Sequence, residues 1–435
     1  MIRILAASLL AFATSAQAQT GPRIEHWLSD SGTPVFFIAA PQIPMLDIQV
    51  VLDAGNSRDG ALPGLSQITH SLLNTGAGDL DADAIAQQFE DVGAAYSAEV
   101  LLDRSKVSLR TLVDPEWREQ ALATFTTVLG QPQFPESQLE RRRQQMQVAL
   151  KKLEESPGAI AQQAFYQAVY PGHPYSSPIA GTEDSLTAIT RDDVEGFYRT
   201  FFASGGAIVA MVGAIDRAEA EAIANRITQV LPQGPAPSPL PPPTAVTEAK
   251  TVAIPHPSEQ AHVLIGQQGV ARGEKFHFPL YLGNYTLGGG GFSSRLMQEI
   301  RNNQGLAYSV YSYFFPLRHL GPFRLGFQTQ KNQVDQALEA AYAELRRFLA
   351  DGPTEEELEH SRNSMVLGFP LRIADNASMI DYLSMIGYYR LPLDYLDTWA
   401  DRIGAISREQ IVTAFQSRLN PDQMITVIVG GQSQP

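Results

Sequence analysis

The 435-residue chain contains no cysteine. Disulfide bonds, a lipid-modified cysteine, a cysteine nucleophile and a cysteine-ligated metal are therefore excluded. The apolar run near the amino terminus, residues 4–14, is shorter than the roughly 20 residues that a membrane-spanning helix needs. Low-complexity and like-charge runs are also missing, so nothing in the composition indicates extensive disorder. These absences leave a packed globular protein without disulfide chemistry.

A basic patch is missing as well. The 46 acidic residues outnumber the 32 basic ones, which gives a formal net charge of -14, and neither kind gathers in a tail or stripe. An acidic surface repels phosphate backbones, so nucleic acid is not expected as a partner. The net charge favours basic or neutral peptides as ligands.

The first residues have the layout of a secretory signal peptide. Arg3 precedes the apolar run, and the small-residue pattern Ala16-Gln17-Ala18 stands directly before Gln19. We expect residues 1–18 to be removed on export to the periplasm. The mature chain would then begin near Gln19 and carry no membrane span.

The length predicts several domains, since a single core rarely grows to this size. The strongest break is residues 231–244, LPQGPAPSPLPPPT, where crowded prolines favour an extended, semi-rigid spacer. This segment divides the chain nearly in half. We place a first domain at 19–230, a Pro-rich linker at 231–250 and a second domain at 251–435.

The two halves resemble each other. The tetrapeptide AITR at 188–191 leads to an apolar run at 207–213, and AISR at 405–408 leads to another at 424–430, at one constant offset of 217 residues. Three further residues recur on helical stretches, where Leu139, Glu140 and Arg143 correspond to Leu358, Glu359 and Arg362. The pattern indicates duplication of a whole domain rather than a short repeat.

Strands and helices interleave irregularly in both halves. Apolar alternation or clustering predicts strands at 46–52, 263–265, 307–315 and 324–329, and helical spacing marks 83–89, 136–154, 334–349 and 355–365. Strands that arrive in pairs among helices favour an α+β fold with helices on one face of each sheet.

A glycine-rich segment at 288–310 reads GGGGFSSRLMQEIRNNQGLAYSV. Its glycines allow a sharp turn, a serine can cap the helix that follows, and Gly305 ends that helix before a β-rich run. No Gly-Lys-Ser/Thr follows the glycines, so the segment is not a phosphate loop. Taken singly, Arg301 is typical of a helix end and Tyr308 of a strand. Arg295 has Glu299 four residues later, which predicts a structural ion pair.

A second motif, Gly64-Leu65-Ser66-Gln67-Ile68-Thr69-His70-Ser71-Leu72-Leu73, lies in the first half. With the glycine-rich segment, it makes nearly the whole mature chain resemble the processing-peptidase branch of the insulinase/pitrilysin zinc peptidases. The resemblance implies two homologous α/β sandwich domains that close as a clam shell around a peptide, with the Pro-rich linker as the hinge.

The resemblance also locates the family's metal site, and the residues there have changed. The family carries two zinc-binding histidines and a glutamate base on one helix, and a glutamate ligand on a later helix. Gln67 stands for the first ligand, His70 for the base and Ser71 for the second ligand. Residues 146–152, MQVALKK, offer no carboxylate, and amides and hydroxyls are poor zinc ligands. We expect no metal in this chain.

Other histidines do not suggest a replacement metal site. Eight are present, but His70 is alone on its helix, and Glu356 with His360 belongs to a strongly charged surface helix. Zinc needs several convergent ligands. His173, between two prolines in the loop PGHPY, is predicted to lie in a rigid surface turn without chemistry.

By contrast, the resemblance implies that Arg301 and Tyr308 are retained from the family's second signature. In the family the corresponding arginine and tyrosine reach the peptide at the zinc of the opposite domain. A guanidinium and a phenol are suitable donors for a carbonyl oxygen that gains charge. Arg301 and Tyr308 are therefore the predicted substrate-contacting residues.

Three functions follow from these motifs. The first is a catalytically incomplete subunit of a heterodimeric metallopeptidase, which supplies Arg301 and Tyr308 to a homologous partner that holds the zinc. The second is a scaffold or peptide-binding protein that has lost proteolysis. The third is a solitary peptidase with an unorthodox metal site. No metallopeptidase activity is expected of the chain alone, and the peptide substrate is not specified by the sequence.

Overall fold

The computed structural model of the protein describes residues 22–430. The predicted signal segment, residues 1–18, lies outside the described residues. From residue 22 to residue 430, no helix is both long and apolar enough to cross a membrane.

The first half contains a six-stranded sheet and a set of helices. In spatial order the strands are β1 (Glu25–Leu28), β2 (Pro34–Ala39), β8 (Ala207–Gly213), β3 (Met45–Leu52), β7 (Ser105–Leu112) and β6 (Ala95–Val100). A small hairpin joins β4 (Gly76–Ala77) to β5 (Leu80–Asp81). The helices are α1 (Leu65–Leu72), α2 (Ala82–Asp91), α3 (Pro115–Gly130), α4 (Glu136–Glu154), α6 (Glu183–Ala188), α7 (Arg191–Phe201) and α8 (Arg217–Val230). Only the β2–β8 pair in this large sheet is parallel.

The second half repeats this design with a five-stranded sheet. In spatial order the strands are β11 (Ala307–Phe314), β12 (Gly321–Gln330), β10 (Gln260–Val270), β13 (Ile425–Val429) and β9 (Lys250–Ile254). The helices are α9 (His277–Asn284), α10 (Val334–Asp351), α11 (Glu355–Gly368), α12 (Asn376–Tyr388), α13 (Tyr395–Gly404), α14 (Arg408–Arg418) and the π-helical η6 (Met297–Asn303). Again one pair is parallel, here β13–β9 at the edge of the sheet, so this sheet is also mixed.

The repeated tetrapeptides begin equivalent helices. Thr190 caps α7 and Ser407 caps α14, each in a reciprocal capping box with the third helical residue. The arginine that follows each cap donates to a carbonyl at an equivalent turn: Arg191 to Phe134 O at 3.0 Å, and Arg408 to Pro353 O at 2.9 Å. The predicted α+β fold with two homologous domains is confirmed down to these contacts.

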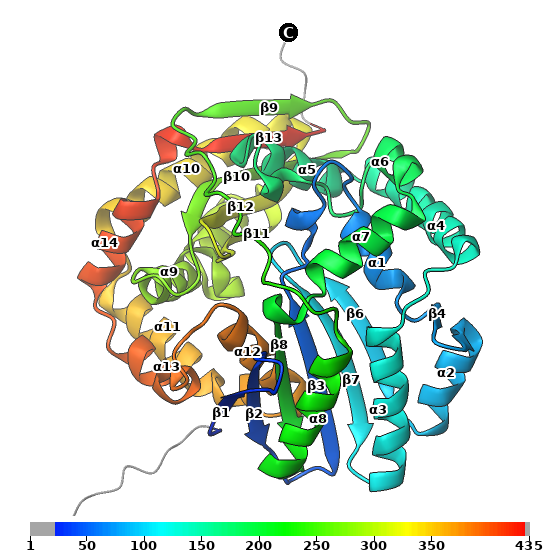
Figure 1. Ribbon diagram of the computed structural model, residues 1–435. Helices are drawn as coiled ribbons and strands as arrows, with labels where there is room; N and C mark the ends of the chain where they lie inside the picture. Colours follow the sequence, from blue (N-terminus) through cyan, green and yellow to red (C-terminus); the bar gives the residue numbers. More distant parts are fainter. Residues whose placement is uncertain (1–21, 431–435) are drawn as a thin grey trace, which may run out of the picture.

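Each sheet is covered on its inner face by a helix from the other half. Helix α5 (Pro157–Val169) comes from the first half and packs on β10 and β13, where Phe165 joins a core with Leu264 and Val427. Helix α12 comes from the second half and packs on β8, β3 and β2. The expectation that helices cover only one face of each sheet is therefore wrong. Figure 1 shows the two halves closed as a clam shell, with α12 beside β8 and α5 beside β10.

The Pro-rich segment contains neither helix nor strand until β9 begins at Lys250. Side chains from both halves hold its carbonyl groups. Arg58 of the first half donates to Ser238 O at 2.8 Å, and Gln268 of the second half donates to Thr244 O at 2.7 Å. The linker is thus fastened to both halves along its length.

Candidate functional site

Helix α1 carries the residues that replace the family's zinc motif. Gly64 caps it in the left-handed region at φ 92°, a conformation that glycine adopts without strain. The buried Asp59 carboxylate accepts from the N–H groups of Gly64 and Ser66, both at 2.8 Å. Burial raises the pKa of Asp59 to about 6 despite these hydrogen bonds.

His70, at the position of the catalytic base, belongs to the core of the first half. Its ring is 2% exposed and lies 4.8 Å from the ring of Phe202. Nδ1 lies 2.7 Å from Ser66 O, and because a carbonyl oxygen only accepts, the proton sits on Nδ1. Nε2 is buried and has no hydrogen-bond partner among the described residues. Burial lowers the pKa of His70 to about 4, so the ring is neutral at pH 7.

Gln67 and Ser71, at the two ligand positions, share the less buried side of α1. The Ser71 hydroxyl donates to Ile68 O of its own helix at 2.8 Å. Between residues 22 and 430, no group of three or more histidines and carboxylates converges as a metal site would require. With a core histidine, an amide and a hydroxyl, the α1 residues do not fit zinc.

The structure brings Arg301 and Tyr308 together in the second half. Arg301 lies on η6 and Tyr308 on β11, and Gly305, at φ 64°, turns the chain between them. The Arg301 guanidinium lies 5.1 Å from the centre of the Tyr308 ring and 4.8 Å from that of Phe292. Both aromatic rings face solvent, with Tyr308 82% and Phe292 71% exposed. The guanidinium is thus held between two exposed aromatic rings, an arrangement stabilised by cation–π attraction.

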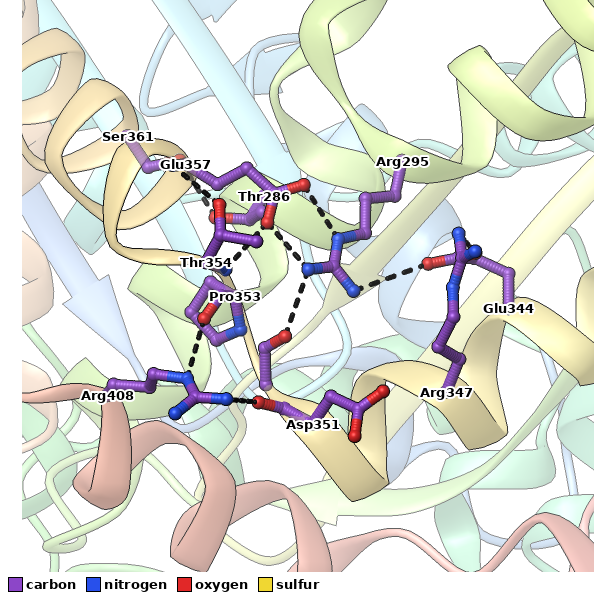
Figure 2. A network of polar contacts seen from close by, with 11 residues as sticks. Thr286, Arg295, Glu344, Arg347, Asp351, Pro353, Thr354, Glu357, Ser361 and Arg408 are labelled. Atoms are coloured by element: carbon purple, nitrogen blue, oxygen red, sulfur yellow. Dashed lines mark hydrogen bonds and ion pairs between the residues drawn. The ribbon is translucent and has the colours of Figure 1, made fainter.

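A polar network behind this surface fixes the start of the Arg301 segment (Figure 2). Arg295 donates two hydrogen bonds to Glu357, at 2.8 and 2.6 Å, and a third to Gly352 O at 3.0 Å. The structural role predicted for Arg295 therefore holds, but the predicted partner is wrong. Glu299 instead accepts from Asn303 and Gln304, and these hydrogen bonds lower its pKa.

The predicted serine cap in this segment is also wrong. Ser293 donates to Gly290 O at 3.0 Å and Ser294 donates to Gly291 O at 2.7 Å. Both hydroxyls are thus used to close the glycine turn, and neither accepts from the helix.

A cavity of about 560 Å³ opens beside Tyr308. Its walls come from the first turns of α5 in one half and from β10, β11 and β12 in the other. Its polar lining includes Tyr308, Tyr311, His262 and Arg324. The cavity is thus lined by residues from both halves.

Sequence reasoning missed a buried polar cluster that joins the halves. The Asp103 carboxylate, in the turn between β6 and β7, accepts from Tyr175 Oη at 2.6 Å, Tyr389 Oη at 3.0 Å and the Arg318 N–H at 2.6 Å. Arg318 and Tyr389 belong to the second half. The sequence signal that could have pointed to this cluster is the PGHPY loop, which contains Tyr175.

His173 in that loop is buried rather than on a surface turn. Nε2 donates to Pro241 O of the linker at 2.9 Å, and Nδ1 accepts from the Tyr175 N–H. His319 of the second half donates to the preceding carbonyl, Leu240 O, also at 2.9 Å. Two histidines, one from each half, therefore clamp the linker.

The fold and the site define a class: a duplicated α+β clam shell with a cavity lined by both halves and, among the described residues of the first half, no zinc-ligand set. Residues 35–183 match the model of the insulinase family, peptidase family M16, and residues 188–365 match that of the peptidase M16 inactive domain. The chain belongs to the M16 peptidase family, as predicted. Within it the chain is of the inactive type, given the residues on α1.

Similar proteins cover the chain almost from end to end. A Helicobacter pylori protein named non-peptidase homolog YmxG is 25% identical over 420 residues, 94% of each chain. A solved structure of the peptidase M16 inactive domain from Pseudomonas fluorescens is 33% identical, with a TM-score of 0.91 over 94% of this chain and 98% of that one. The structure of a Helicobacter pylori protease shares the fold, with a TM-score of 0.87 at 17% identity.

Proposed function

We propose that this chain is the zinc-free subunit of an exported two-subunit peptidase, which presents Arg301 and Tyr308 to a peptide held at the zinc of a homologous partner. The observation that carries the proposal is the contrast between the halves. His70 on α1 is part of the core, whereas Arg301 stacks on the exposed ring of Tyr308, which lines the cavity. The partner would hold the zinc, the water and the general base.

The contribution of this chain would be binding and orientation. The Arg301 guanidinium carries five donors and makes no side-chain hydrogen bond or ion pair to any described residue, so its donors remain available to a peptide carbonyl. Tyr308 adds a phenolic donor. Donors that are already in place where charge develops on a carbonyl oxygen lower the barrier without reorganisation.

The test is reconstitution with a homologue from the same genome that has the intact zinc motif. We expect each chain alone to be inactive on peptides and the mixture to cleave them. Arg301→Ala with Tyr308→Phe should lower kcat/KM of the mixture roughly a hundredfold, the usual effect of removing a transition-state donor. Arg346→Ala is the matched control, because Arg346 is exposed and pairs with Asp422 away from the chamber. Full activity of the double variant would overturn the proposal.

The second candidate is a non-proteolytic peptide-binding or scaffold protein of the same family. The name of the Helicobacter pylori relative, non-peptidase homolog YmxG, favours this second function. Under this function the mixture would not cleave, while the chain would still bind peptides. The same reconstitution, with binding measured beside cleavage, separates the two functions.

A further inference from the structure

The cavity beside Tyr308 is the uncovered part of the second sheet's inner face. Helix α5 covers β10 and β13, and it leaves β11 and β12 open. Alternate residues of a strand share a face, and on β12 this face carries Arg324, Gly326 and Gln328. Tyr311 of β11 pairs with Gly326, and the missing side chain there leaves room for the Tyr311 ring. The result is a hollow with an aromatic floor.

Arg324 is the only charged group that the cavity contains. Its guanidinium lies 4.8 Å from the centre of the Phe315 ring, and its Nε is buried without a hydrogen-bond partner. In the part of the chain from 22 to 430, no carboxylate lies within ion-pair distance of it. By contrast, the partly buried Arg418 is paired and donates two hydrogen bonds to Glu274, both at 2.9 Å. Arg104 and Arg272 also have buried nitrogen atoms without a partner, but neither lines this cavity. A partly buried guanidinium without a partner costs free energy that a bound anion would recover.

The remaining walls favour the same kind of ligand. Among residues 22–430, no aspartate or glutamate lines the cavity, although the full sequence has 46 acidic residues. Hydroxyl groups of Tyr308 and Tyr311 and the amides of Gln162 and Gln328 can all donate hydrogen bonds. The first turn of α5, at Ser156 and Gly158, also opens on the cavity and adds the positive end of its helix dipole. The protein as a whole is acidic, but the local charge of this cavity is positive.

We infer that this cavity binds a carboxylate of the peptide, held by the planar donors of Arg324 beside the Arg301–Tyr308 pair. The inference deepens the proposed function, on which its biological role rests, because it names the class of peptide: one with an acidic side chain or a free carboxyl terminus near the site. A guanidinium matches a carboxylate with two parallel hydrogen bonds. The local charge therefore overrides the expectation of basic or neutral peptides that the net charge gave.

Direct binding to the purified mature chain, without any partner, tests this inference. Isothermal titration calorimetry would compare three short peptides of otherwise identical sequence. The first is amidated and contains one glutamate, the second is amidated with glutamine in its place, and the third contains glutamine and a free carboxyl terminus. We expect at least one carboxylate peptide to bind roughly tenfold more tightly than the amidated glutamine peptide, the usual value of a charge-assisted hydrogen bond. Which of the two does so identifies the source of the carboxylate.

Variants of Arg324 show whether this residue causes the preference. Arg324→Gln should abolish it, and Arg324→Lys should keep part of it, since lysine retains the charge without the fork. Arg346→Gln is the exposed control and should change nothing. Equal binding of all three peptides, no binding of any, or an unchanged preference in folded Arg324→Gln would each overturn the inference. Because no cleavage is measured, failure of the shared-catalysis proposal would leave this result intact.

Discussion

The inner faces of the two sheets differ in how their charges are used. On the first sheet, a cavity of about 290 Å³ lies between β6, β7 and α12. Its charged groups pair with each other: Arg110 with Asp47 at 2.7 Å, and Lys106 with both Glu99 and Asp381 at 2.9 Å. On the second sheet, the corresponding cavity holds Arg324 with no carboxylate in its lining.

The two copies of the duplicated domain therefore use the charged side chains on their inner sheet faces differently. In the cavity of the first half the charged groups form ion pairs with each other. The position of the family's catalytic base is occupied by His70, which is buried in the core. In the second half the side chains of Arg301, Tyr308 and Arg324 make no hydrogen bond to any described residue, and we propose that they serve a ligand. Paired charges stabilise a fold at small net gain, whereas unpaired buried donors favour binding.

The largest expected effect on stability comes from removing the Asp103 contacts that join the two halves. Asp103 accepts three hydrogen bonds, two of them from the second half, so Asp103→Ala leaves one buried and two partly buried donors without this acceptor. We expect the free energy of unfolding to fall by about 4 kcal/mol. Chemical denaturation would measure it. Asp401→Ala, at an exposed position on α13, should change it by less than about 0.5 kcal/mol, and equal losses in both variants would refute a joint at Asp103.

A smaller effect on stability is expected from His70 on α1, and it depends on pH. Because the pKa of His70 is lowered from 6.5 to about 4, the unfolded chain binds a proton at higher pH than the folded chain does. The contribution of His70 is thus complete above pH 6.5 and is lost as the pH falls toward 4, a change of about 3 kcal/mol.

His70→Leu removes this dependence while keeping an apolar side chain of similar size in the core. Denaturation of both proteins at several pH values would show the wild type losing stability faster than the variant between pH 6.5 and 4. Comparison with the variant cancels other groups, such as Asp59, whose raised pKa acts with the opposite sign. Parallel curves for the two proteins would mean that His70 is not a neutral core residue.

Much of the fold could be predicted because local patterns determine it. Helix α4 has the predicted bounds, and the AITR and AISR repeats mark the equivalent caps of α7 and α14. The turn at Gly305 follows from glycine chemistry. These features depend on residues that are close in the chain.

The parts that sequence reasoning missed depend on distant residues. The helical patterns in the sequence did not include α5 or α12, and local periodicity does not show which sheet a helix covers. Arg295 pairs with Glu357 rather than with its helical neighbour, and His173 is buried because the linker returns to it. Likewise, a net charge does not report the charge of one cavity, so Arg324 carried no signal of its own.

We propose that this chain binds no zinc at the position of the family's metal site and keeps the half that contacts the substrate. The zinc content of the purified mature chain is the most direct measurement. The protein is equilibrated with excess zinc, desalted, and analysed by inductively coupled plasma mass spectrometry. The account predicts far less than one zinc per chain, since Gln67, His70 and Ser71 provide no ligand set. One tightly held zinc per chain would contradict it.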